Sequence, residues 1–266
     1  MRNADAVRPA ATSAASWLGR RNPTIKLTLL FVVSLVMLFV FDPVTPTILY
    51  LVALAAVAVS TRLSARTLML AHLPFIGFAV GLFCVNALSR PGEIIWDGWL
   101  LRITTEGVTM GAALAMRTLV IGILSIAFVA STDPVALMTS LQHNARLSPR
   151  VTYAVLAGYR MLQEMPAEWH TIRQAQAVRA GRGGSTLPRG ARALTRAAFT
   201  LLVVSVRKGE RISQALESRG LGLSPRSTWR PVSVRKTDWF LTAGVLTVLA
   251  GVVVLVPSSA ALQGWW

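Results

Sequence analysis

The sequence predicts an all-α, polytopic membrane protein with about five transmembrane helices and a set of amphipathic helices on the cytoplasmic side. Hydrophobic residues make up 53% of the 266 residues and charged residues only 14%, and the mean hydropathy is +0.55. This composition is too apolar for an ordinary soluble domain. Positive charge is also unevenly placed, because residues 132–236 carry 17 of the 27 Lys and Arg.

The first apolar run, from Leu27 to Phe41, follows Arg20 and Arg21 and could be read as a signal peptide. No small-x-small cleavage site follows it, because Asp42-Pro43 ends the run and a second apolar run starts at once. We therefore interpret the run as a transmembrane helix.

Five stretches are long enough to cross a bilayer, whose core of about 30 Å needs roughly 20 helical residues. They cover about 26–41, 44–60, 66–88, 107–130 and 239–256. The predicted organisation has four parts: an N-terminal tail (1–25), four transmembrane helices (26–131), a long cytoplasmic helical region (132–236), and the last transmembrane helix with an external tail (237–266).

The positive charge predicts the orientation, since basic loops stay on the cytoplasmic side. The tail, the link with Arg62 and Arg66, and the region 132–236 then share that side. An N-terminus inside and a C-terminus outside require an odd number of spans, and five satisfies this. We expect a multi-pass protein of the inner cell membrane with a cytoplasmic N-terminus.

Arg117 lies in the middle of the fourth predicted span. Such an arginine costs at least about 2.5 kcal/mol on insertion scales, so it should face protein or water rather than lipid. Snorkelling toward one surface and a specific contact between helices both remain open, and no acid in the predicted spans is an obvious partner. The single cysteine, Cys84, excludes a disulfide within the chain.

The region 132–236 reads as three amphipathic helices. Asp133-Pro134 and Ser148-Pro149 are helix starts, with an N-cap residue followed by proline at the first helical position. The second helix should bend at Pro166 and stop at the glycines from Gly181 onward, and the third should start after Pro188. We expect the second and third helices to cross, burying each other's apolar surfaces and leaving both charged C-terminal ends on the cytoplasmic side.

These two long helices finish on similar clusters of small residues, arginine and a turn. Arginine in a last helical turn followed by glycine is a common way to end a helix, so one such cluster is weak evidence. Two of them on consecutive helices favour two similar partners, because an exposed arginine can dock in an acidic or carbonyl-lined groove. The candidate binding residues are Ala175, Gln176, Arg179, Ala180, Ala215, Glu217, Arg219 and Gly220.

With these clusters the chain resembles the transmembrane T components of energy-coupling factor transporters, which include the cobalt permease Q-type proteins. Asn22 to Leu27 is similar to the family's opening Asp-Pro-Arg-Thr-Lys-Leu, and residues 132–150 resemble its first coupling segment. The two helix ends match its paired Ala-Arg-Gly signatures. The first end departs from the pattern, with Ala180 where the family usually has glycine.

The resemblance implies a non-catalytic subunit of an ATP-driven importer for a vitamin or a transition metal. Family T components join a membrane-embedded S component to two cytoplasmic ABC-type ATPases, and both signature arginines insert into the ATPases. The chain itself has no phosphate-binding loop, because residues 181–185 lack its lysine and its spacing. We expect no cofactor, no metal and no nucleic acid partner. The interpretation requires tips that are neither far apart nor inside the bilayer.

Two other classes of function remain as alternatives. An intramembrane enzyme is disfavoured because His72, His143 and His170 are not spaced for a metal site or a triad. A basic protein that binds anionic lipid or nucleic acid at the membrane surface is the second alternative. Against nucleic acid, the arginine-rich stretch 173–196 contains no aromatic residue for base stacking.

Overall fold

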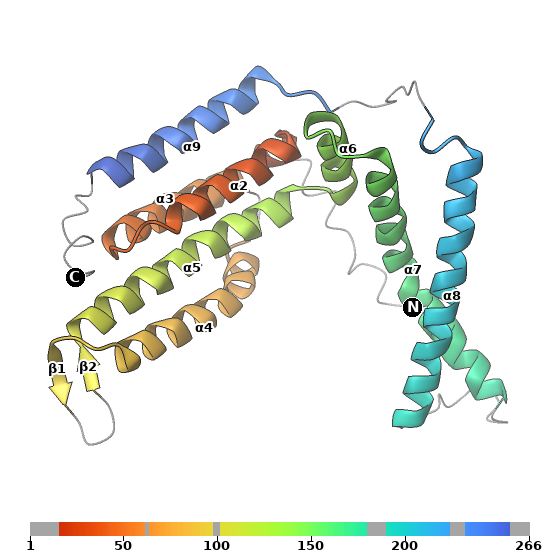
Figure 1. Cartoon of the computed structure of the whole chain (residues 1–266), viewed down its shortest axis with the longest axis horizontal. Coiled ribbons are helices and arrows are strands. Elements are labelled where there is room, and N and C mark those ends of the chain that lie inside the picture. The colour runs from red at the N-terminus through yellow and green to blue at the C-terminus, as the bar shows by residue number, and fades with distance from the viewer. Residues whose placement is uncertain (1–15, 62–63, 98–101, 180–189, 224–231, 256–266) are drawn as a thin grey trace. The chain divides into compact units, whose positions relative to one another are not determined.

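The structure, a computed structural model, describes residues 16–61, 64–97, 102–179, 190–223 and 232–255 (Figure 1). It confirms the all-α prediction, with one short hairpin as the only strands among these residues. The elements are η1 (Leu18–Arg20), α2 (Pro23–Met37), α3 (Val44–Ser60), α4 (Ala65–Ser89), β1 (Ile94–Asp97), β2 (Arg102–Thr104), α5 (Thr105–Ser131), α6 (Pro134–Asn144), α7 (Pro149–Arg179), α8 (Ala191–Ser218) and α9 (Lys236–Leu255). The chain forms two compact units, which we call the membrane unit (1–137 with 233–266) and the helical arm (138–232).

The membrane unit is a layer of apolar helices lying side by side (Figure 1). Its centre is α5, which packs against α2, α3 and α4, while α9 packs against α2 and α3. Met37 of α2 and Val120 and Ile123 of α5 are among its most buried side chains, each at most 1% exposed. The outward faces of these helices are apolar as well, as expected for a layer surrounded by lipid.

All five predicted spans are helices, but not all have the predicted length. Helices α4, α5 and α9 are long and apolar enough to cross a membrane. Helices α2 and α3 are shorter, with 15 and 17 residues. The first span ends at Met37 rather than at 41, because the chain turns toward Asp42-Pro43, where the Asp42 carboxylate accepts a hydrogen bond from the Thr45 N–H. It begins at Pro23, where the Asn22 side chain caps the helix.

Glycines bring α5 into close contact with α4. A Cβ atom at Gly107 would lie 2.7 Å from the carbonyl oxygen of Asn86, and one at Gly111 would lie 2.9 Å from that of Phe83. The two glycines are four residues apart and so face the same side of α5. This spacing of small residues lets the backbones of two membrane helices approach each other.

The helical arm contains the two long helices that the sequence predicts. The Ser148 side chain accepts a hydrogen bond from the Val151 N–H, so α7 starts at the predicted Ser-Pro signal. Helix α7 continues through Pro166 for 31 residues and bends along its length (Figure 1). Helix α8 runs in the opposite direction and crosses α7, as predicted (Figure 1).

An ion-pair cluster joins the two long helices. Lys208 of α8 pairs with Glu164 at 3.3 Å and also with Glu168, both of α7. The hydrogen bond to Glu168, and to a smaller extent the one to Glu164, raises the pKa of Lys208, so the ammonium stays charged. Because Lys208 is partly exposed, the cluster mainly sets the register of the pair rather than its stability.

The α4–α5 contact gives a first prediction. Replacing Gly111 by Leu should lower the unfolding temperature in detergent, because overpacking a close contact typically costs about 1–3 kcal/mol. The control is Gly81→Leu on α4, where a Cβ atom meets nothing within 4 Å. Equal unfolding temperatures for the two variants would show that the α4–α5 contact is not close.

Candidate functional site

The first arginine end closes α7. Ala175 and Arg179 are exposed, Gln176 is half-buried, and Arg179 is the last residue of the helix. Ala180 lies outside the described residues. Among the residues that the structure describes, Arg179 forms no ion pair. Its guanidinium is therefore exposed at the C-terminal end of the helix.

The second arginine end closes α8 with a defined turn. Gly220 has φ +81°, its N–H donates to the Glu217 carbonyl at 2.9 Å, and the Leu221 N–H donates to the Leu216 carbonyl at 3.0 Å. This pair of bonds is the Schellman motif, which glycine favours because it has no Cβ. Arg219 precedes the glycine as the C-cap residue and is exposed, as are Ala215 and Glu217. The turn fixes the backbone that presents Arg219.

The two ends lie at opposite ends of the α7–α8 pair. Glu168 of α7 and Lys208 of α8 form an ion pair and so mark where the two helices meet. Arg179 lies eleven residues beyond Glu168 along α7, and Arg219 lies eleven residues beyond Lys208 along α8, which runs in the opposite direction (Figure 1). At 1.5 Å per residue, the ends are roughly 30 Å apart. This departs from the expectation that the tips are not far apart. The reason is that consecutive antiparallel helices place each C-terminus beside the N-terminus of the other helix, so the two arginine ends are separate surfaces.

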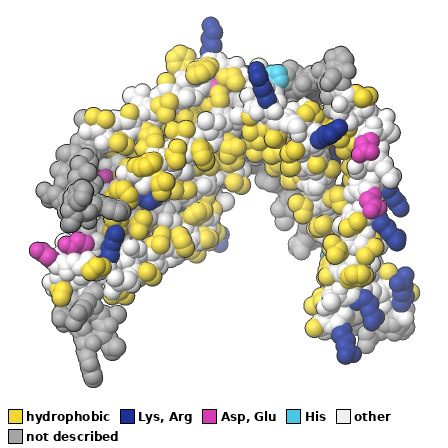
Figure 2. All heavy atoms as spheres, in the orientation of Figure 1, with side chains coloured by type: hydrophobic (Ala, Val, Ile, Leu, Met, Phe, Trp, Pro, Cys, Tyr) yellow, Lys and Arg dark blue, Asp and Glu magenta, His cyan; other side chains and the backbone are white. Residues whose placement is uncertain are grey.

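The two arginine ends differ in charge. Arg179 shares its end of the pair with Arg192 and Arg196 at the start of α8, and all three are exposed. No acidic residue occurs between 169 and 209. Figure 2 shows Lys and Arg gathered at this end of the arm, with Asp and Glu farther along it. The other end carries Glu217 beside Arg219. The α7 end is therefore the more cationic surface.

A buried polar cluster lies in the membrane unit, where α2 and α9 begin and α5 ends. The Lys26 ammonium donates to the carbonyl and the hydroxyl of Ser131 at 2.8 and 3.2 Å. The Asp238 carboxylate accepts from the backbone N–H groups of Asn22 at 3.3 Å and Arg235 at 2.9 Å. The side chains of Asn22, Lys26, Ser131 and Asp238 are all at most 6% exposed. We call these four residues the junction cluster.

The junction cluster holds together the helix ends that lie before and after the arm in the chain. Ser131 ends α5 just before the chain enters the arm, and Asp238 begins α9 just after the chain returns. Both are held to the start of α2. The sequence comparison identified Lys26 as part of the opening signature but missed Asp238. Asp238 is the third residue of α9 and accepts from the N–H of Arg235, which is the backbone half of a capping box, so an acid in the first turn could have indicated a structural role.

Arg117 makes a specific contact between helices. Its Nη2 donates to the Val40 carbonyl at 2.6 Å, and its guanidinium lies 5.7 Å from the centre of the Phe41 ring. The arginine therefore satisfies a carbonyl group just beyond the end of α2 instead of snorkelling to a surface. A free carbonyl at this depth would be costly, which explains the mid-span arginine.

The histidines lie in three different helices. His72 is buried in α4, with its Nε2 3.3 Å from the Tyr50 hydroxyl. His143 and His170 are exposed on α6 and α7. Within the described residues, no group of three His, Cys, Asp or Glu side chains could hold a metal ion. The histidines therefore contribute to packing and to the surface in the part of the chain that the structure describes.

Comparison with known proteins identifies relatives along most of the chain. The cobalt transport protein (CbiQ) family model matches residues 14–229. The chain is 24% identical over 245 residues to the energy-coupling factor transporter transmembrane protein EcfT of Thermosediminibacter oceani, covering 88% of this chain and 92% of the relative. It is 25% identical over 218 residues to EcfT of Thermanaerovibrio acidaminovorans, covering 77% and 79%.

A third relative differs in kind. A putative ABC transporter ATP-binding protein of Bifidobacterium longum is 24% identical over 268 residues, which cover 95% of this chain but 34% of that protein. The family match covers most of the chain, including both arginine ends and the start of α2. The chain therefore belongs to the cobalt transport protein family, CbiQ, and is a transmembrane T component of an energy-coupling factor transporter.

Proposed function

We propose that the chain transmits ATP-driven motion from two cytoplasmic ATPase subunits to a membrane-embedded, substrate-binding S component. The observation that carries the proposal is the pair of exposed arginine ends, Arg179 and Arg219, at opposite ends of two crossed helices. A separation of roughly 30 Å is too large for one small groove, so each end meets its own ATPase subunit. The proposal thus keeps the two partners that the sequence predicted and drops the requirement that the two arginine ends lie close together.

The choice of ATPases as partners has independent support. The Bifidobacterium longum relative, a putative ABC transporter ATP-binding protein, contains a region similar to almost all of this chain. This chain has no phosphate-binding loop of its own. Energy from ATP then has to come from another protein, and this chain acts as a non-catalytic subunit.

The S component meets the apolar faces of the arm. Phe199, Leu202 and Val206 of α8 are spaced by three and four residues, so they form one face, and each is more than half exposed. Exposing such an apolar face to water would be energetically unfavourable. A second membrane protein would bury it, and the bilayer surface would cover what remains. The S component selects the substrate, a vitamin or a transition metal.

The membrane topology follows from the same proposal. The arm lies in the cytoplasm with the ATPases, and the N-terminus, which precedes α2 by a short basic tail, lies on the same side of the inner membrane. Movement of the arm reaches the membrane unit along the chain at Ser131 and Asp238. The junction cluster, which holds both residues to α2, resists their separation.

Charge reversal tests the arginine ends. Arg179→Glu and Arg219→Glu should each weaken co-purification with the cognate ATPases about 30-fold or more, because breaking a buried charge contact costs about 2 kcal/mol or more. The double variant should abolish uptake. Arg207→Glu, an exposed position in the middle of α8, is the matched control. Undiminished ATPase binding and uptake in the double variant would exclude these arginines as contact points.

The glycine turn gives a separate prediction. Gly220→Val forces a β-branched residue to a positive φ, so the turn should open at a cost of about 1–2 kcal/mol. We expect faster hydrogen exchange at residues 220–221 and weaker binding of one ATPase subunit, with Arg219 unchanged. Gly209→Ala in the same helix has open space for a Cβ atom and should leave both measurements unchanged. Normal exchange in Gly220→Val would contradict the assigned role of the turn.

The junction cluster is tested by a double-mutant cycle. The charges of Lys26 and Asp238 attract each other. Lys26→Met and Asp238→Asn should each lower the unfolding temperature, because each leaves the other buried charge without its opposite. The double variant should lose less stability than the sum of the two single variants. In the assembled transporter, Lys26→Met should reduce uptake more than ATP hydrolysis. Equal loss of both activities would indicate a structural role alone.

A further inference from the structure

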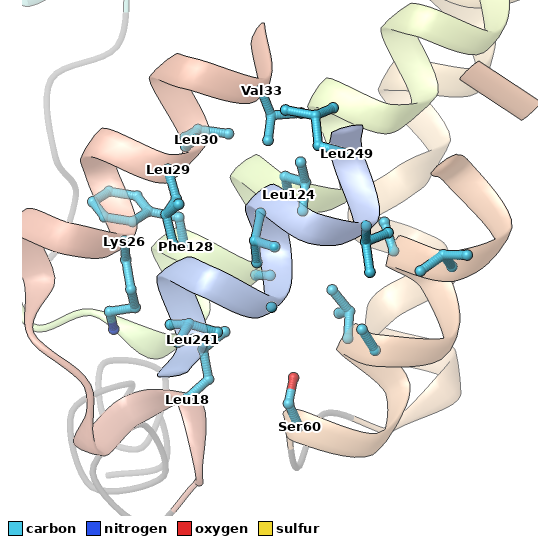
Figure 3. Close-up of a pocket in the computed structure, with 18 of the residues that line it drawn as sticks. Leu18, Lys26, Leu29, Leu30, Val33, Ser60, Leu124, Phe128, Leu241 and Leu249 are labelled. Atoms are coloured by element: carbon cyan, nitrogen blue, oxygen red, sulfur yellow. The ribbon is translucent and has the colours of Figure 1, made fainter. Parts of the chain in front are cut away.

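A second feature of the membrane unit is an apolar groove of about 990 Å³, lined by side chains of α2, α3, α5 and α9 with η1 and its preceding residue (Figure 3). Apart from Lys26 and Ser60, every lining residue is apolar. The Lys26 ammonium is already bound to Ser131. The groove therefore offers an extended apolar surface with polar groups only near one end.

The groove is as long as one leaflet of a bilayer. Leu18, Ser60 and Leu241 lie at one end and Val33 and Leu249 at the other (Figure 3). Along α9 the lining runs from 240 to 249, which is about 14 Å of helix, close to half of a 30 Å bilayer core. A transmembrane helix of a partner needs about 20 residues and does not fit this length.

The inner end of the groove is closed by the protein core. Val33 and Leu249 are at most 6% exposed, and they pack in one cluster with Met37, Leu49 and Val120. The outer end remains open, because Trp17 and Phe240 there are 51% and 77% exposed. The groove is also open along its side, where Val52 and Val248 are 41% and 40% exposed, so an occupant can enter laterally or from the end that carries the basic start of α2.

Two arginines, Arg20 and Arg21, follow the lining residues Trp17 and Leu18 at the open end of the groove. The Arg21 guanidinium lies 4.2 Å from the centre of the Trp17 ring, which lines the groove, and Arg20 beside it is exposed. The Arg21 Nε is buried and has no hydrogen-bond acceptor among the described residues. Asp238, the acid of this end, already accepts from two backbone N–H groups. A tryptophan and arginines at one end of an apolar span match the level of lipid headgroups.

We propose that the groove binds one anionic phospholipid from the leaflet on the basic side of the chain. An acyl chain lies along α9 as far as Leu249, and the headgroup phosphate accepts hydrogen bonds from Arg21. The lipid fills the space between α9 and the helices that it contacts, α2 and α3. Bound lipid therefore stabilises the docking of α9. This inference does not depend on the proposed coupling role.

The test uses the purified full-length chain, stripped of lipid in detergent, with dioleoyl phosphatidylglycerol or dioleoyl phosphatidylcholine added. Native mass spectrometry should show one retained phosphatidylglycerol, preferred over phosphatidylcholine roughly fivefold or more. Phosphatidylglycerol should also raise the unfolding temperature. No retained lipid, or equal retention of the two lipids, would overturn the proposal.

Two pairs of variants locate the lipid. Gly244→Phe should fill the groove and abolish retention, because a Cβ atom at Gly244 meets nothing within 4 Å and the position lines the groove. Gly251→Phe on the same helix also has open space, lies outside the lining, and should retain the lipid. Arg21→Gln should remove the preference for phosphatidylglycerol, whereas Arg66→Gln on α4 should keep it. Lipid retention in Gly244→Phe equal to wild type, or a partner protein cross-linked in the groove in place of lipid, would refute the site.

Discussion

The packing of the membrane unit depends on one constraint: a polar group that is buried away from water must find a hydrogen-bond partner within the protein. The junction cluster meets this need at the start of α2, where Lys26 donates to Ser131 at the end of α5 and the Asn22 N–H donates to Asp238 of α9. Arg117 follows the same rule at the other end of α2, where it satisfies the Val40 carbonyl. Apolar packing holds the helices together, but these polar contacts decide where each helix must begin or end.

The arm follows a different constraint. Helices α7 and α8 expose apolar and charged surface in turn, so their stability and position depend on partners more than on a core of their own. An antiparallel crossing turns two similar sequence clusters into two distant contacts, one purely cationic and the other set by a glycine turn. The CbiQ membership and the ATP-binding relative support ATPases as the proteins that receive these contacts. A lipid in the groove along α9 would stabilise the helix that follows the arm in the chain.

Sequence reasoning reached most of the helices, because membrane spans are long apolar runs and helix starts use side chains next to them in the chain. The Asp133 and Ser148 caps illustrate this local logic. It was less successful with the length of the first span, where the turn before Asp42 and the distant Arg117 contact end the helix early. It also gave no indication of the hairpin of β1 and β2, or of the close approach of α4 to Gly107 and Gly111.

The amino-acid sequence by itself determined the all-α membrane class, the order of the helices, the glycine at the end of α8 and the family signatures, because each depends on composition or on neighbours a few residues away. Only the tertiary structure decided that Asp238 and Lys26 share a buried cluster, that Arg117 binds a carbonyl rather than reaching a surface, and that Arg179 and Arg219 stand at opposite ends of a pair. These facts depend on which helices pack together and in which direction. Contacts between residues tens or hundreds of positions apart leave no periodic pattern in a single chain.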